Sequence, residues 1–84
     1  MNLQSQFEQA LADSKTLDER PDPMTMLKLY SLYKQASSGD ASGERPGVTD
    51  MINRAKWDAW EALKGTSTDD AMQQYVNLVA ELKG

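Results

Sequence analysis

The sequence contains no cysteine and no histidine among its 84 residues. Without cysteine there is no disulfide, no thiolate nucleophile and no thiolate metal site. Without histidine the chain lacks the commonest general base and transition-metal ligand. The two absences exclude most hydrolytic machinery and leave carboxylates, lysine, tyrosine and serine as the possible catalytic groups. We therefore expect no enzymatic activity, no metal site and no cofactor.

Long apolar runs are also missing. No stretch approaches the roughly 20 apolar residues that a membrane span requires, and residues 1–12 lack a basic region followed by an apolar run. The net charge of -4 makes general attraction to DNA, RNA or anionic lipid weak. We expect a cytoplasmic protein without a nucleic-acid partner or stable membrane insertion, which holds any anionic ligand by local groups.

The periodicity of the apolar residues predicts an all-α fold in a single domain, residues 1–84. Four segments have helical spacing, approximately 3–15, 22–37, 49–65 and 67–82, and we find no alternating strand pattern. The expected inward faces are Leu3, Phe7, Ala10 and Leu11; Met26, Leu27, Tyr30 and Tyr33; Ile52, Ala59, Trp60 and Leu63; and Ala71, Tyr75, Leu78, Val79 and Leu82.

Capping signals mark where these helices begin and end. Asp22 before Pro23 offers a capping oxygen followed by a residue suited to the first helical position. Thr49 or Asp50 is expected to cap the third helix, which should stop at Gly65. Ser67 has an acidic residue three positions later, the spacing of a capping box at the start of the fourth helix.

The connections between the helices differ in length. The longest irregular segment, residues 38–48, holds three of the five glycines and is able to cross the bundle, which would place helices two and three parallel. The two short connections favour antiparallel neighbours for helices one and two and for helices three and four. An up-down-down-up order is therefore permitted.

Two lysines occur within the apolar stripes. On a helical wheel Lys34 lies about 40° from Tyr30, and Lys56 lies among the apolar residues of helix three. One interpretation is that their aliphatic stems cover the core while the ammonium groups reach water. Residues 23–38 contain no acidic residue, so the counter-charge of Lys34 comes either from another helix or from a bound phosphate.

The three tyrosines allow two interpretations as well. Tyr30, Tyr33 and Tyr75 could be core aromatics whose hydroxyls lie at the surface, which is common for tyrosine. As a set beside two lysines, they offer a ring for stacking on a base and phenols for hydrogen bonding. That combination describes a pocket for a nucleotide phosphate. Trp57 and Trp60 are interpreted as structural.

The order and spacing of these motifs resemble the acyl-coenzyme A (acyl-CoA) binding protein family, also called the diazepam-binding inhibitor family. The resemblance extends from Phe7 to Leu82 and is carried by short segments. These are residues 26–27, 30–36 (YSLYKQA), 39–40, 45–47 (RPG) with Asp50, 55–60 (AKWDAW), 63–65, 71–72 and Tyr75.

This resemblance implies a skewed four-helix bundle, up-down-down-up, with a long loop between helices two and three. It implies non-covalent binding of medium- to long-chain fatty acyl-CoA by a monomeric carrier and pool former in fatty acid metabolism and transport, with acyl-CoA-using enzymes as possible partners. The implied ligands of the headgroup and its 3'-phosphate are Lys15, Tyr30, Tyr33, Lys34, Lys56 and Tyr75.

Two positions and one segment depart from the family pattern, and two other functions stay open. The segment, residues 21–25, is not the usual lead-in to helix two. Leu32 stands where a polar or histidine side chain is common, and Ile52 replaces a frequent lysine. A thioesterase or isomerase is one alternative. A helical module whose apolar groove takes a partner helix is the other, although such a groove does not require centred lysines.

Overall fold

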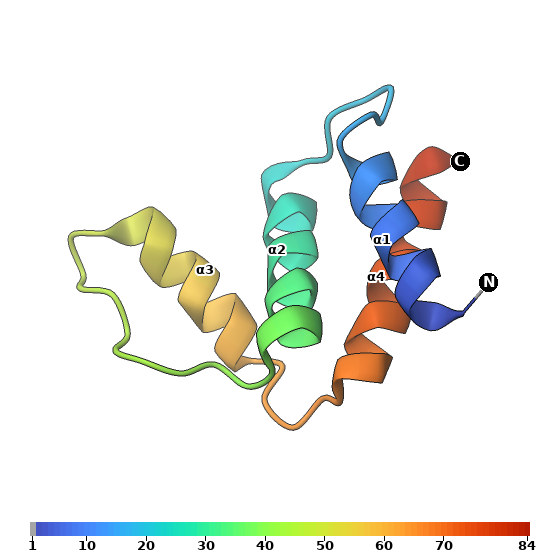
Figure 1. Ribbon diagram of the computed structural model, residues 1–84. Helices are drawn as coiled ribbons and strands as arrows, with labels where there is room; N and C mark the ends of the chain where they lie inside the picture. Colours follow the sequence, from blue (N-terminus) through green and yellow to red (C-terminus); the bar gives the residue numbers. More distant parts are fainter. Residues whose placement is uncertain (1) are drawn as a thin grey trace.

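The computed structural model describes residues 2–84, and within them the chain forms four helices and no strand. The helices are α1 (Leu3–Ser14), α2 (Pro23–Ser38), α3 (Met51–Glu61) and α4 (Thr68–Lys83). Figure 1 shows the chain running up, down, down and up again. The all-α fold with this order of directions is confirmed. None of these four helices has the length and apolarity needed to cross a bilayer.

The predicted caps form at the start of α2 and α4. The Asp22 Oδ1 atom accepts a hydrogen bond from the Thr25 N–H at 2.7 Å, and Pro23 follows as the first helical residue. Ser67 Oγ accepts from the Asp70 N–H at 3.1 Å. Each bond satisfies one of the backbone donors that a helix start leaves free.

The predicted start of α3 is confirmed at Asp50, whereas its predicted end differs from the structure. Asp50 is the N-cap residue, but its side chain makes no capping bond and accepts from Asn53 Nδ2 at 3.1 Å instead. The helix ends at Glu61, four residues before Gly65, which lies in the following turn at φ +90°. The prediction was wrong here because the glycine terminates the turn and not the helix.

α4 is the central helix of the core. It packs against α1 on one side and α2 on the other, and α3 packs on α2. Both short connections join antiparallel helices, as predicted (Figure 1). Within residues 2–84, however, the backbone of α1 does not approach that of α2, nor does α3 approach α4, so the prediction that these pairs are direct neighbours is wrong. The small buried residues Ala10, Ala36 and Ala71 allow α1 and α2 to approach α4 closely, and the short connections permit this arrangement.

α2 uses a different face for the core than predicted. Leu29, Leu32 and Ala36 are its buried apolar residues and pack with α4. Of the predicted stripe, Met26, Leu27 and Tyr30 line the cavity toward α3, whereas Tyr33 lines a hollow with Tyr75 of α4. Met26 and Tyr33 are 40% and 41% exposed. The helix carries apolar residues on two faces because it lies between α4 and α3.

The long loop is attached to α3 by side chains. Trp60 Nε1 donates to the Gly39 carbonyl at 2.7 Å, and Trp57 Nε1 donates to the Ser42 carbonyl at 3.3 Å. Arg45 makes two hydrogen bonds to the Asp58 carboxylate, at 2.8 and 2.7 Å. Such bidentate pairs fix geometry as well as adding energy. These bonds support the structural interpretation of both tryptophans.

A second set of bonds joins the end of α2 to the turn before α4. Asp40 Oδ1 accepts from Gln35 Nε2 at 2.8 Å and from the Gly65 N–H at 2.9 Å. The fully buried Gln35 also donates to the Thr66 carbonyl at 2.8 Å. The Gly65 N–H, followed by the Gln35 amide, lowers the pKa of Asp40 below its usual value of 3.8.

Candidate functional site

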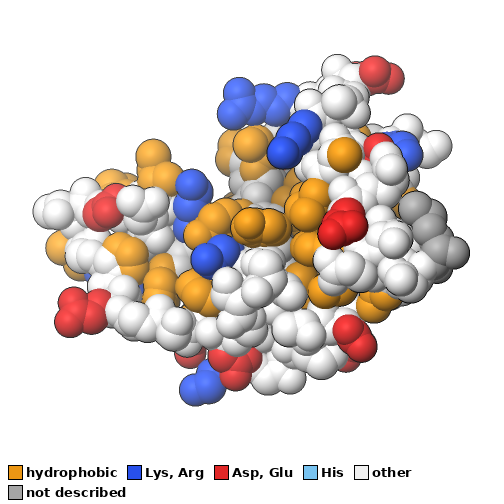
Figure 2. All heavy atoms as spheres, in the orientation of Figure 1, with side chains coloured by type: hydrophobic (Ala, Val, Ile, Leu, Met, Phe, Trp, Pro, Cys, Tyr) orange, Lys and Arg blue, Asp and Glu red, His pale blue; other side chains and the backbone are white. Residues whose placement is uncertain are grey.

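An apolar cavity of about 510 Å³ lies between α2 and α3. The two helices meet at the C-terminal end of α3 and diverge toward its N-terminus (Figure 1). Figure 2 shows hydrophobic side chains on both sides of the indentation between them, with Lys and Arg side chains beside these. The lining residues are Pro23, Met24, Met26, Leu27, Tyr30, Met51, Ile52, Ala55 and Lys56. Lys56 is the single charged residue of this lining.

A smaller hollow of about 240 Å³ adjoins this cavity, and the two share Met26 and Tyr30. The predicted tyrosines Tyr30, Tyr33 and Tyr75 all line it, together with Ser14. Three tyrosines from α2 and α4 are thus gathered directly beside an apolar cavity. The arrangement offers ring faces and phenols next to a space that favours a hydrocarbon chain.

Tyr75 lines the smaller hollow, and its hydroxyl already has a hydrogen-bond partner within the protein. The side chain is 4% exposed and packs edge-on against Phe7, with ring centroids 5.3 Å apart and planes at 76°. Its hydroxyl donates to Ser14 Oγ at 3.1 Å, and that serine donates to the Leu11 carbonyl at 2.8 Å. These contacts support the core interpretation of Tyr75, and its role as a ligand of the headgroup stays a prediction.

Each predicted lysine of the helix pair lies over an aromatic ring of the other helix. The Lys56 Nζ atom is 5.2 Å from the centroid of the Tyr30 ring, and the Lys34 Nζ atom is 4.8 Å from a Trp60 ring centroid. A cation in this position is attracted by the ring, by about 0.5–1 kcal/mol at exposed sites. The two contacts interlock α2 and α3.

The counter-charge expected for these lysines is not a carboxylate of the described chain. The ion pairs between residues 2 and 84 are Arg45–Asp58 at 2.7 Å and Lys83–Asp13 at 3.1 Å. Lys34 and Lys56 are half-buried and belong to neither. An ammonium group above a ring keeps its N–H donors, which can still bind an oxyanion.

Lys15 lies apart from the other predicted site residues. It caps the C-terminal end of α1, where its backbone N–H bonds to the Ala12 carbonyl at 3.2 Å, and its side chain is exposed. It lines neither hollow but directly follows Ser14, which does. Its role in the headgroup site stays a prediction.

Sequence reasoning missed several residues of the apolar cavity. Met24 and Met51 are 75% and 76% exposed and stand at the starts of α2 and α3. Ile52, expected on the inward face of its helix, is 73% exposed at the same cavity. The available signal was apolar residues in the first turns of two helices that run in the same direction.

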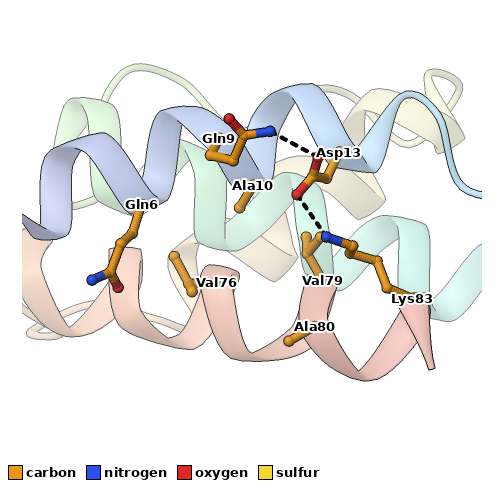
Figure 3. A pocket seen from close by; sticks show the side chains of 8 residues that line it. All are labelled: Gln6, Gln9, Ala10, Asp13, Val76, Val79, Ala80 and Lys83. Atoms are coloured by element: carbon orange, nitrogen blue, oxygen red, sulfur yellow. Dashed lines mark hydrogen bonds and ion pairs between the residues drawn. The ribbon is translucent and has the colours of Figure 1, made fainter. Parts of the chain in front are cut away.

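A further apolar groove lies between α1 and α4 (Figure 3). It measures about 200 Å³, and no predicted site residue lines it. Asp13 accepts hydrogen bonds from Gln9 at 3.0 Å and Lys83 at 3.1 Å, and these two bonds, in that order, lower the pKa of Asp13. The Lys83–Asp13 pair bridges one end of the groove, as Figure 3 shows.

The chain is similar to known proteins in both sequence and fold. Residues 4–79 match the family model described as Acyl CoA binding protein. The chain is 45% identical over its whole length to the acyl-CoA-binding protein of Ricinus communis, of which it covers 93%. It is 46% identical over 98% of its length to acyl-CoA-binding domain-containing protein 1 of Oryza sativa subsp. japonica, of which it covers 90%.

A solved structure supports the same relationship. The crystal structure of Oryza sativa acyl-CoA-binding protein 2 superposes with a TM-score of 0.92 at 41% identity. The superposition covers 96% of this chain and 90% of the rice protein.

Proposed function

Because this chain belongs to the acyl-CoA-binding protein family, we propose that it binds acyl-CoA thioesters non-covalently and carries them. Its family is one of binding proteins and not of enzymes. The observation that carries the proposal is the pairing of two hollows, an apolar cavity with one ammonium group in its lining and a tyrosine-lined hollow that shares Tyr30 with it. The ligand has the same two parts, a chain and a nucleotide.

The headgroup belongs to the polar side of this pair. Tyr30, Lys34 and Lys56 bind the 3'-phosphate, with charge-assisted hydrogen bonds that are each worth about 1.5–3 kcal/mol. Tyr33 and the ring of Tyr75 adjoin the adenine. Lys15 adds a cation near the headgroup. Within residues 2–84, Lys34 and Lys56 have no carboxylate partner. This supports the assignment, because a bound phosphate would supply the counter-charge that they lack.

The acyl chain belongs to the cavity between α2 and α3. Burial of each methylene contributes about 0.8 kcal/mol, so a chain of about 14 to 16 carbons contributes roughly 10 kcal/mol before the ordering costs of binding are subtracted. The cavity volume of about 510 Å³ and its apolar lining support a medium- to long-chain ligand. Free coenzyme A, which lacks the chain, binds far more weakly.

In the cell such a complex acts as a soluble store of activated acyl chains. The bound thioester is shielded from hydrolysis, and its chain is kept out of membranes. We propose that the protein works in the cytoplasm as a monomer of one domain, without a cofactor, and that acyl-CoA-using enzymes load and unload it.

Isothermal titration calorimetry tests the proposal. Palmitoyl-CoA is titrated into the protein, with free coenzyme A and palmitate in parallel experiments. We expect tight one-to-one binding of the thioester and weak binding of both halves. The contacts of the headgroup give specificity for coenzyme A thioesters, and burial of the acyl chain supplies most of the affinity. No binding of palmitoyl-CoA would overturn the proposed function, and equal binding of palmitate would overturn the phosphate site.

A further inference from the structure

The methionines of this chain are concentrated at one site. The structure describes four of the five, and Met24, Met26 and Met51 all line the α2–α3 cavity. Their exposed fractions are 75%, 40% and 76%. Met72, the fourth, is partly buried against the core formed by α1, α2 and α4. Three accessible thioethers therefore surround the proposed place of the acyl chain.

A thioether in such a position reacts with peroxides. The sulfur lone pair attacks one peroxide oxygen, the O–O bond breaks, and the thioether is oxidised to a sulfoxide while hydrogen peroxide is reduced to water. No base or metal from the protein is needed, since accessibility sets the rate. The product is a polar group that replaces an apolar one.

We propose that Met24, Met26 and Met51 form an oxidation site, at which a peroxide lowers the affinity for the acyl chain and from which a bound chain excludes the peroxide. The proposal rests on the proposed function for its effect on binding. Binding and oxidation are then mutually antagonistic, because both involve the same three side chains. Reduction of the sulfoxides restores the cavity.

The effect falls mainly on the acyl part of the ligand, because Met24 and Met51 line the apolar cavity and not the tyrosine-lined hollow, whereas Met26 lines both. The proposed phosphate ligands Tyr30, Lys34 and Lys56 contain no sulfur and are not oxidised by this reaction. A sulfoxide covered by a hydrocarbon chain loses its bonds to water without gaining others. Burial of a polar group without a partner costs about a factor of ten or more in an equilibrium constant.

The first test measures the rate of oxidation at each methionine. The ligand-free protein is treated with hydrogen peroxide, and peptide mass spectrometry follows each sulfoxide over time. We expect Met24 and Met51 to react fastest and Met72 slowest. Saturating palmitoyl-CoA should slow the three cavity methionines by about fivefold or more, whereas free coenzyme A should not. Equal rates at all four methionines, or no protection by palmitoyl-CoA, would overturn the proposal.

The second test compares binding before and after oxidation. Peroxide treatment should weaken palmitoyl-CoA binding by about tenfold and coenzyme A binding much less. Methionine sulfoxide reductase with dithiothreitol should reverse the loss. In a variant with Met24→Leu, Met26→Leu and Met51→Leu the affinity should be the same before and after treatment. Leucine replaces the thioether with a hydrocarbon of similar volume. Met72→Leu is the matched control, and in this variant peroxide treatment should still weaken palmitoyl-CoA binding.

The outcomes separate this proposal from the function on which it rests. If the untreated protein does not bind palmitoyl-CoA, both the proposed function and the effect of oxidation on it are wrong. If the untreated protein binds and the oxidised protein binds equally well, only the oxidation site is wrong. If peroxide weakened palmitoyl-CoA binding equally in the triple leucine variant, the oxidation site would also be wrong.

Discussion

Lys34 and Lys56 are held in place by aromatic rings and not by carboxylates. Lys34 lies over Trp60 and Lys56 over Tyr30, so each ammonium group is positioned by a residue of the facing helix. A carboxylate would neutralise the charge and occupy its donors, whereas a ring does neither. This support keeps both cations in place without removing their attraction for a phosphate.

The lysine substitutions test this interpretation. We expect Lys34→Ala and Lys56→Ala each to weaken acyl-CoA binding by about 2 kcal/mol, the magnitude of a charge-assisted hydrogen bond. Isothermal titration calorimetry measures the loss, and circular dichroism checks the helices. Lys64→Ala removes the same charge from the exposed turn before α4 and should leave affinity unchanged.

The same variants distinguish phosphate binding from core packing. If the lysines bind the headgroup, the loss should be similar for palmitoyl-CoA and for free coenzyme A. Unchanged affinity in both variants would assign the lysines to the other interpretation, in which their stems cover apolar surface and the ammonium groups only reach water.

The helical wheel could predict one half of the site. The positions of Tyr30, Lys34 and Lys56 in their helices follow from sequence spacing. The structure brings Lys56 over Tyr30 at the α2–α3 cavity, whereas Lys34 lies over Trp60 and lines neither hollow. Met24 and Met51 could not be predicted as cavity residues, because their places depend on how far α3 diverges from α2. That angle is set by packing and by the long loop.

At the scale of the element, helix starts were predictable and the end of α3 was not. Ser67 and Asp22 cap their helices through bonds to residues only three positions away. The turn after α3, in contrast, is joined to Asp40, whose carboxylate binds the Gly65 N–H from 25 positions away in the chain. Capping bonds between near neighbours can be predicted from the local sequence, whereas a bond between distant parts of the chain cannot.

The cap of α4 supports a prediction about stability. Ser67→Ala removes the oxygen that accepts the Asp70 N–H and should destabilise the protein by about 1 kcal/mol. Urea denaturation followed by circular dichroism measures the change. Ser67→Asn keeps an acceptor at the same position and should lose much less. An unchanged urea midpoint in the alanine variant would show that water replaces the cap without cost.

The bonds of Asp40 support a prediction about acid stability. Its folded-state pKa is lowered, first by the Gly65 N–H, so between that value and 3.8 the folded chain holds the ionised form while the unfolded chain is protonated. The unfolded state then binds more protons, and stability falls as pH drops through this range. We expect Asp40→Asn to flatten the decline in unfolding free energy below pH 3.8.

The matched control is Asp18→Asn, which removes the same charge from the exposed α1–α2 connection. Urea denaturation at several pH values between about 5 and 2.5 compares the two variants with the unaltered protein. The asparagine at position 40 keeps an oxygen acceptor, so near neutral pH the fold persists. A slope identical to that of the unaltered protein would show that Asp40 does not contribute to the acid sensitivity.

At the scale of the whole molecule, α3 is attached to the remainder of the protein differently from the other helices. The core joins α1, α4 and α2, and within residues 2–84 the packing of α3 on another helix involves α2 alone. The described chain is correspondingly flat, 39 × 28 × 15 Å. Connection lengths could not predict this, because the choice of neighbours depends on where small residues let helices approach.

This asymmetry predicts how the protein opens. Elements with few buried apolar contacts open at a lower free energy than the core, so in the ligand-free protein the amides of α3 should exchange with solvent faster than those of α4. A ligand that binds between α2 and α3 must leave before α3 can separate. At a free concentration of 100 times its dissociation constant, it should slow that exchange by about 100-fold.

Hydrogen–deuterium exchange with mass spectrometry measures both effects. Palmitoyl-CoA should raise the protection of α3 toward that of α4, whereas free coenzyme A, which leaves the apolar cavity empty, should raise it much less at the same fractional saturation. The first-turn amides of α1, whose residues line neither hollow, should not change with either ligand and are the internal control. Equal protection of α3 and α4 without ligand would mean that the bonds between α3 and the long loop hold α3 as firmly as a core contact does. These bonds run from Trp57 and Trp60 to loop carbonyls and from Arg45 of the loop to Asp58.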